Sequence, residues 1–248
     1  MSAVVTPAIT LATGRRVLLQ VRHDPRTLGL MLVVPAALVG VLAWIYADQP
    51  ALFDRVGADL LGVFPLVVMF LVTSVATLRE RTTGTLERLM TMPLARGDFV
   101  LGYALAFGAL AVVQALVVSL LALGPYGLDV VGTVWAVLLV AVLDALLGTA
   151  LGLCVSAFAS TEFQAVQFMP AVVFPQLLVC GLLVPTDQMP AALSAVAHVL
   201  PMTYAVDAMS RLSVGGVDGA VLVDLAVVAA FVVAALVAGA ATLRRRTP

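Results

Sequence analysis

The sequence has 248 residues, of which 62% are hydrophobic and 11% are charged, with a formal net charge of −1 and a mean hydropathy of +1.14. Soluble domains carry about 25% charged residues, and the six long apolar runs cannot all be core helices of one soluble domain. The composition therefore predicts an all-α polytopic membrane protein. The runs lack the alternation of a membrane β-barrel, and we expect no nucleic-acid partner.

The sequence contains no lysine, because all thirteen basic residues are arginine. A P-loop needs a lysine to contact the β- and γ-phosphates of a nucleotide. We therefore expect no standard ATP site and no enzymatic activity on this chain. Cys154 and Cys180 lie in separate apolar runs without the spacing of a disulfide or a metal site, so we interpret them as packed thiols and expect no metal.

The first 27 residues are predicted to form a helix that lies in the membrane interface. Thr6-Pro7 is typical of a helix start, and Asp24-Pro25 is typical of a helix end. Apolar and arginine-bearing arcs largely separate on the helical wheel, which suits contact with lipid and anionic head groups. The alternative is a plain lead-in to the first span.

Six membrane spans are expected in residues 28–243, followed by a tail at 244–248, all within a single domain over residues 1–248. The predicted spans are 28–46, 60–78, 99–124, 130–159, 165–184 and 225–243. A short polar loop is expected at 48–59. The apolar pieces within 185–219 are too short to cross the bilayer, so we expect re-entrant or interfacial helices there.

Arginine placement predicts the orientation of the chain. If the N-terminus is cytoplasmic, eleven of the thirteen arginines fall in cytoplasmic segments and only Arg55 and Arg211 lie outside. Six spans then return the C-terminus to the cytoplasm. The arginine-only, alanine- and valine-rich composition indicates a bacterial source, so the expected location is the bacterial inner membrane.

The segment 79–99 is the longest strongly charged run and separates two of the predicted spans. Gly84 is an acceptable N-cap, and Glu87 lies where an acid complements the helix dipole. About two helical turns fit before Pro93, and such a short helix is marginal alone in water. A partner surface would stabilise it. The alternative is a solvated loop without a partner.

Two blocks of sequence carry a resemblance to a known family. The first comprises residues 80–89, Met92-Pro93-Leu94 and Gly102-Tyr103; the second comprises Pro185, Met189-Pro190, residues 200–205 and Arg211. In this order and spacing, they make the chain resemble the type-2 ABC exporter permeases of the daunorubicin-resistance kind. The resemblance covers nearly the whole chain.

The resemblance implies that the loop between spans 2 and 3 is a coupling helix that docks on a separate ATPase subunit. The implied docking residues are Gly84, Thr85, Leu86, Glu87, Arg88 and Leu89, with Glu80 and Arg81 at the rim. It also implies short re-entrant helices on the outer side, and we select there Pro185, Pro190, Pro201, Tyr204 and Arg211. The implied assembly has two permease halves, as a homodimer or with a different second permease, and two ATPase subunits that carry ATP and Mg.

Asp144 is the one acid expected deep in a span, where an ionised group costs about 3 kcal/mol on insertion scales. It is a candidate contact for a cationic substrate or a proton, and Gln114, Gln167 and Gln176 are candidate pathway residues. The alternative for all four is structural hydrogen bonding between helices.

The sequence thus predicts the permease subunit of an ATP-driven exporter for a drug-like, lipid or other amphipathic substrate, in contact with membrane lipid. One alternative is an ion-coupled secondary transporter that uses Asp144. Another is a non-transporting membrane anchor or sensor for a soluble partner. The identity of the substrate is not encoded in any motif of the sequence.

Overall fold

The computed structural model describes residues 6–82 and 96–242, which form helices and connecting turns without any strand. The helices are α1 (Pro7–Arg22), α2 (Pro25–Ile45), α3 (Pro50–Thr82), α5 (Arg96–Leu123), α6 (Val134–Ser156), α7 (Glu162–Val179), the short 3-10 helix η1 (Thr186–Gln188), α8 (Ala191–Ala197), α9 (Pro201–Val214) and α10 (Gly219–Thr242). The all-α class predicted from composition is confirmed.

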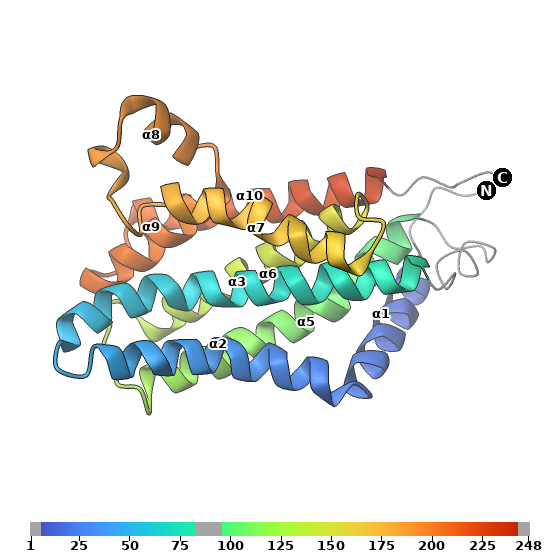
Figure 1. The fold of residues 1–248 in the computed structure, drawn as a ribbon, viewed down its shortest axis with the longest axis horizontal. Coiled ribbons are helices and arrows are strands. Elements are labelled where there is room, and N and C mark those ends of the chain that lie inside the picture. The colour runs from blue at the N-terminus through green and yellow to red at the C-terminus, as the bar shows by residue number, and fades with distance from the viewer. Residues whose placement is uncertain (1–5, 83–95, 243–248) are drawn as a thin grey trace.

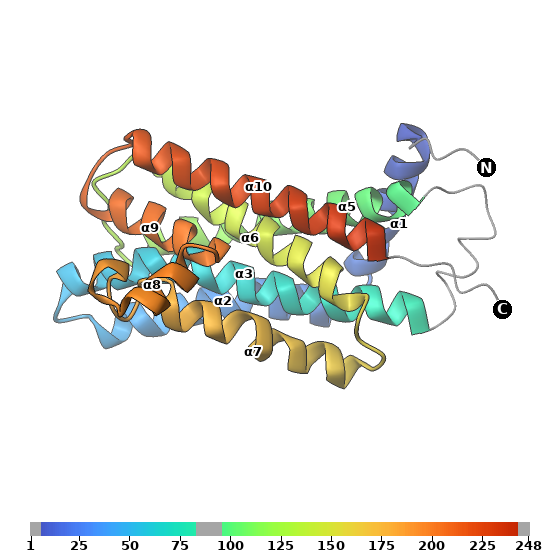
Figure 2. The same cartoon turned by 90° about the horizontal axis from the view of Figure 1, so that it is seen from above.

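The long axis of the described structure is followed by α2, α3, α5, α6, α7 and α10 (Figure 1). At one end, α1 crosses this bundle beside the last turn of α3 and the first turn of α5. At the opposite end lie α8 and α9, and the view from above shows the same separation (Figure 2). The predicted interfacial helix and the predicted re-entrant helices are therefore at opposite ends of the bundle.

Local sequence accounts for several of the helix starts. The side chain of Asp24 accepts a hydrogen bond from the backbone N–H of Thr27 at 3.2 Å, and Pro25 occupies the first position of α2. Thr161 caps α7 through the N–H of Gln164 at 3.1 Å. The break between α1 and α2 therefore falls at Asp24-Pro25, as the sequence predicts.

Within residues 6–82 and 96–242, five helices are long and apolar enough to cross a membrane: α2, α3, α5, α6 and α10. The count rises to six if α8 and α9, which are bent by 89° to one another, form one broken span. The predicted fifth span corresponds to α7, which is not among the five, because its 18 residues include Pro170, Pro175 and several glutamines. Its ribbon still lies alongside α3 in both views.

Several predicted boundaries are wrong. The helix α3 begins at Pro50, so most of the expected loop at 48–59 is helical. The helix α7 ends at Val179, short of residue 184, because Gly181 has a φ of 98° that breaks a right-handed helix. The helix α10 starts at Gly219 rather than 225 and takes in Asp224, whose carboxylate lies 3.5 Å from Arg211 of α9. The predicted span begins after Asp224 because it is defined as an uncharged run. The ion pair with Arg211 allows this acid to lie inside the helix.

The core of the bundle is the contact between α3 and α6, where two glycines bring the backbones together. A Cβ at Gly148 would lie 2.2 Å from the carbonyl oxygen of Leu66, and one at Gly152 would lie 2.6 Å from that of Phe70. Small residues allow this approach between membrane helices. This packing fixes α3, whose last turn carries the candidate site.

Candidate functional site

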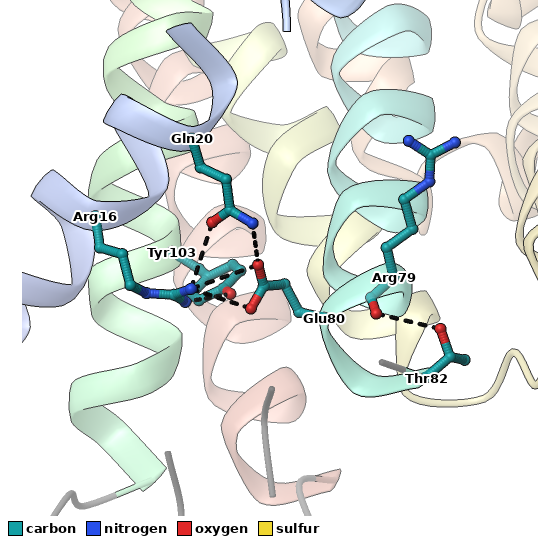
Figure 3. Close-up of polar contacts among 6 residues, drawn as sticks. All are labelled: Arg16, Gln20, Arg79, Glu80, Thr82 and Tyr103. Carbon is teal, nitrogen blue, oxygen red and sulfur yellow. Dashed lines mark hydrogen bonds and ion pairs between the residues drawn. The ribbon is translucent and has the colours of Figure 1, made fainter. Parts of the chain in front are cut away.

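A polar cluster joins α1, α3 and α5 at one end of the bundle (Figure 3). Arg16 of α1 lies 3.2 Å from Oε2 of Glu80 on α3 and donates to the hydroxyl of Tyr103 on α5 at 2.8 Å. Gln20, one turn after Arg16, donates through Nε2 to the same Glu80 carboxylate. One carboxylate at the end of α3 therefore accepts hydrogen bonds from two side chains of α1.

The cluster is partly shielded from solvent, which strengthens its electrostatic contacts. The Glu80 side chain is 8% exposed and that of Arg16 is 33% exposed. Burial lowers the pKa of Arg16, whereas electrostatic interactions and hydrogen bonds with Tyr103 and Glu80 raise it. The raising effects together outweigh burial, so the pKa of Arg16 lies above its ordinary value. The Tyr103 ring lies 5.9 Å from the Arg16 guanidinium carbon and 4.2 Å from the Phe99 ring.

A second contact fixes α1 to the start of α5. Oδ1 of Asp98, which is 1% exposed, accepts hydrogen bonds from the backbone N–H of Thr6 at 2.7 Å and from Oγ1 of Thr10 at 2.9 Å. Close packing adds to this contact, because a Cβ at Gly102 would lie 2.7 Å from the side chain of Thr13. The helix α1 is therefore held against α5 over more than one turn.

The end of α3 and the start of α5, which flank residues 83–95, both lie at this cluster. Glu80 lies three residues before residue 83, and Asp98 lies three residues after residue 95. The predicted docking residues Gly84, Thr85, Leu86, Glu87, Arg88 and Leu89 lie outside the described residues. So does the side chain of Arg81, although its backbone belongs to α3. Glu80, predicted at the rim, is buried and bonded within the chain.

Arg79, the neighbour of Glu80, points away from the cluster (Figure 3). Its guanidinium donates to both carboxylate oxygens of Glu162, at 2.8 and 3.1 Å. This bidentate pair connects the end of α3 to the first turn of α7. Both side chains are about half exposed, at 56% and 49%, so solvent screens the pair.

Asp144 lies on α6 inside the bundle, with 1% exposure and no hydrogen-bond partner for either carboxylate oxygen among the described residues. The position of a Cβ on Gly62 of α3 would be 2.8 Å from its Oδ2. Met209 of α9 is also near this point. The residue is therefore enclosed by α3, α6 and α9 within one chain.

The three candidate glutamines occupy different environments. Gln114 of α5 is fully buried and donates through Nε2 to the carbonyl of Met31 at 2.8 Å. Pro35 lacks the N–H that would normally bond this carbonyl, so Gln114 replaces a missing helix hydrogen bond. Gln176 is buried and bonds the carbonyl of Val172 in its own helix at 3.0 Å, whereas Gln167 is exposed on α7. The structure does not gather the three around Asp144.

The predicted outer residues all lie in the α8–α9 region. Pro185 and Pro190 precede η1 and α8, and Pro201 occupies the first turn of α9. The Tyr204 hydroxyl donates to the carbonyl of His198 at 2.7 Å, and Arg211 pairs with Asp224. Each has a structural partner or a helix-start role.

Sequence reasoning did not identify Arg16, Gln20 and Asp98 as parts of one site. None belongs to a recognisable motif, and their partners are distant in sequence. Arg16 and Gln20 contact Glu80, and Asp98 contacts Thr6, over separations of 60 to 92 residues. Tyr103 was included in a family motif but without a role. One residue in the sequence could have indicated this contact. Asp98 is an acid at the start of an apolar span, and an acid in that position needs a hydrogen-bond partner.

Comparison with known proteins identifies the family to which this fold belongs. Residues 9–212 match the family described as ABC-2 type transporter. The chain belongs to this family. The match covers α1 through most of α9, and so includes both the α1–α3–α5 cluster and the outer helices.

Several named ABC transporter proteins are similar to this region of the chain. The chain is 32% identical over 146 residues to ABC transporter G family member 20 of Dictyostelium discoideum, covering 59% of this chain and 20% of that protein. It is 28% identical over 162 residues to the probable multidrug ABC transporter permease YbhS of Escherichia coli K12, covering 63% and 42%. Nodulation protein J of Rhizobium leguminosarum bv. viciae is 26% identical over 171 residues, covering 65% and 62%.

The matched region spans less than two thirds of each of these relatives. The family match and the apolar helices together show that this chain is a multi-pass membrane protein and a transmembrane subunit of an ABC transporter. The resemblance to type-2 ABC permeases is thereby confirmed. The α1–α3–α5 cluster is the site in the described structure most directly connected to the segment expected to bind an ATPase.

Proposed function

We propose that this chain is the permease subunit of an ATP-driven exporter and that a separate ATPase subunit docks on the segment between α3 and α5. The observation that carries the proposal is that α1 is bonded to both flanks of this segment, through Glu80 before it and Asp98 after it. A displacement of the segment would pull on α3, α5 and α1 together.

The proposed mechanism begins with ATP binding and closure of two ATPase subunits, which carry ATP and Mg. Their movement displaces the segment 83–95 of each permease half. Because α3 is packed tightly on α6 through Gly148 and Gly152, the displacement moves these two helices as a unit. Two permease halves, in a homodimer, then rock about their interface and open the pathway to the outer side.

The proposed orientation follows the arginine distribution, with α1 at the cytoplasmic face of the bacterial inner membrane and α8 and α9 at the outer face. The proposed substrate is an amphipathic drug-like molecule or lipid. One relative is named as a probable multidrug permease, which supports this class. The apolar character of the helices also favours a substrate that partitions into the membrane.

The deciding experiment is to purify the full chain alone and with its ATPase partner. The single chain is expected to hydrolyse no ATP, and the complex is expected to show magnesium-dependent hydrolysis that candidate amphiphiles stimulate. Glu87→Arg is expected to weaken association with the ATPase without unfolding the permease. Robust hydrolysis by the single chain, or unchanged co-purification of Glu87→Arg, would contradict the proposal.

The Asp144 carboxylate is buried and has no hydrogen-bond partner in the described parts of the chain. This observation favours a second candidate function, an ion-coupled transporter that uses Asp144. An exporter driven by ATP should continue to transport after Asp144→Asn, because the amide preserves the shape of the side chain. A carrier that uses this group for a proton should stop. Transport assays in vesicles, with and without the ATPase, separate the two.

A further inference from the structure

A cavity of about 440 Å³ borders the α1–α3–α5 cluster, and both Glu80 and Arg79 line it. Its walls come from α1, α2, α3 and α5, and Val166 of α7 contributes to its edge. The volume is within the range of about 300–1,000 Å³ typical of ligand pockets. Neither the coupling mechanism nor the family assignment uses this cavity.

The two ends of the cavity differ in polarity. Its polar groups gather at the cluster end and include Gln20, Asp24, Thr27, Arg79 and Glu80. The Glu80 carboxylate is bonded to Arg16 and Gln20 of α1, so its charge is compensated within the cluster. Away from this end the α3 wall is apolar back to Val68, which is about 18 Å from Glu80 at 1.5 Å per residue. An occupant must therefore have a polar head and a long apolar part.

The polar end carries opposite charges on different walls. Asp24 lies at the start of α2, and Arg79 lies on the last turn of α3. Hydrogen bonds from the side chain and backbone of Thr27 hold the pKa of Asp24 below its ordinary value, so its carboxylate is ionised at neutral pH. A head group that contains both an ammonium and a phosphate complements this pair.

The cavity is open toward the surface that faces the membrane. Leu30, Val34 and Val166 line it and are also exposed, at 63%, 37% and 43%. Leu30 and Val34 belong to α2, a helix long and apolar enough to span a bilayer. An amphiphile can therefore enter sideways from the lipid, without passing through water.

We propose that this cavity binds a phosphatidylethanolamine molecule from the leaflet that surrounds α1. One acyl chain lies between α2 and α3, the phosphate contacts Arg79 and the ammonium contacts Asp24. The bound lipid fills the space beside Glu80 and supports the packing of α1 and α2 on α3. The choice of the cytoplasmic leaflet rests on the proposed orientation, whereas the site itself does not depend on the exported substrate.

The first test measures lipid that stays with the protein. The full chain is extracted from membranes that contain equal amounts of phosphatidylethanolamine and phosphatidylglycerol, washed in detergent and analysed by native mass spectrometry. The unmodified chain is expected to retain one phosphatidylethanolamine. Val72→Trp fills the cavity and should lose it, whereas Leu120→Trp, at a 63% exposed position of α5 outside the cavity, should retain it.

Val34→Trp, at the cavity edge, gives a second blocking variant if Val72→Trp does not fold. Retention of the lipid by a folded blocking variant would overturn the proposal. Retention of phosphatidylglycerol as readily as phosphatidylethanolamine would overturn the assignment of the head group.

The second test uses the Arg79–Glu162 pair as an internal control. Arg79→Gln and Glu162→Gln both break this ion pair, but only Arg79→Gln removes a charge from the cavity. Loss of a charged hydrogen bond to phosphate should weaken binding of phosphatidylethanolamine about tenfold in Arg79→Gln. Binding should be unchanged or stronger in Glu162→Gln. An equal loss in both variants would show that the ion pair, and not a phosphate contact, holds the lipid.

Asp24→Asn keeps an N-cap for α2 while removing the carboxylate charge. It should abolish the preference for phosphatidylethanolamine over phosphatidylglycerol, and an unchanged preference would contradict the ammonium contact. ATPase activity of the assembled complex is measured on the same samples. Lipid binding and ATP-driven transport can then fail independently, so a negative result for one leaves the other interpretable.

Discussion

At the residue scale, the buried polar groups of this protein differ in whether the chain supplies their partners. Glu80 accepts hydrogen bonds from two side chains of α1, and Gln114 bonds a carbonyl that Pro35 leaves open. Asp144 has no hydrogen-bond partner among the described residues. The first two were classed from sequence as a docking residue and a pathway residue, and their contacts favour anchoring roles for both. Polarity identifies such residues as important, but only their contacts show why.

The Arg16–Glu80 pair should be worth more than the Arg79–Glu162 pair, because Glu80 is 8% exposed and Glu162 is 49% exposed. We expect a coupling energy of about 1–2 kcal/mol for the first pair from a double-mutant cycle with Arg16→Gln and Glu80→Gln. The same cycle for Arg79 and Glu162 should give about 0.5 kcal/mol or less. Reversible unfolding in detergent measures both, and equal coupling energies would show that burial does not strengthen the α1 contact.

At the scale of elements, the close contact of α3 and α6 depends on residues without side chains. Gly148→Ala should destabilise the protein by roughly 3 kcal/mol, because its Cβ would overlap the backbone of Leu66. Gly29→Ala in α2 is the matched control, since no atom lies within 4 Å of a Cβ there. Unfolding measurements on both variants check the difference. A Gly148→Ala variant as stable as Gly29→Ala would mean that the helices can separate at little cost.

The contact of α2 with α5 should depend on a proline. Gln114→Leu removes the hydrogen bond to the Met31 carbonyl and should cost about 1 kcal/mol. In a Pro35→Ala background, the new backbone N–H can bond this carbonyl, so the same substitution should cost less. The comparison requires unfolding free energies of the two single variants and the double variant. Equal costs in both backgrounds would disprove the link between Pro35 and Gln114.

At the scale of the whole molecule, the orientation rests on the arginine distribution and the separation of α1 from α8 and α9. Single cysteines at Arg22 and Ala192, in a chain with Cys154 and Cys180 replaced by alanine, mark the two ends. A membrane-impermeant maleimide should label Ala192→Cys on intact spheroplasts and Arg22→Cys only in inverted vesicles. The cysteine-free chain controls for background. Labelling of both positions from one side would contradict the arrangement.

The amino-acid sequence alone was enough to predict the helical class, the membrane setting, the break at Asp24-Pro25 and the family. These follow from hydrophobicity, caps and local motifs, which act over a few residues. It placed helix ends less well, because Asp224 is tolerated in α10 beside Arg211 and Gly181 stops α7 before its apolar run ends. Only the tertiary structure joined Arg16, Glu80 and Tyr103, and only it enclosed the cavity that Arg79 and Asp24 line. Such sites depend on which helices pack together, and the hydrophobic pattern of a membrane helix carries little of that information because most of its faces are apolar.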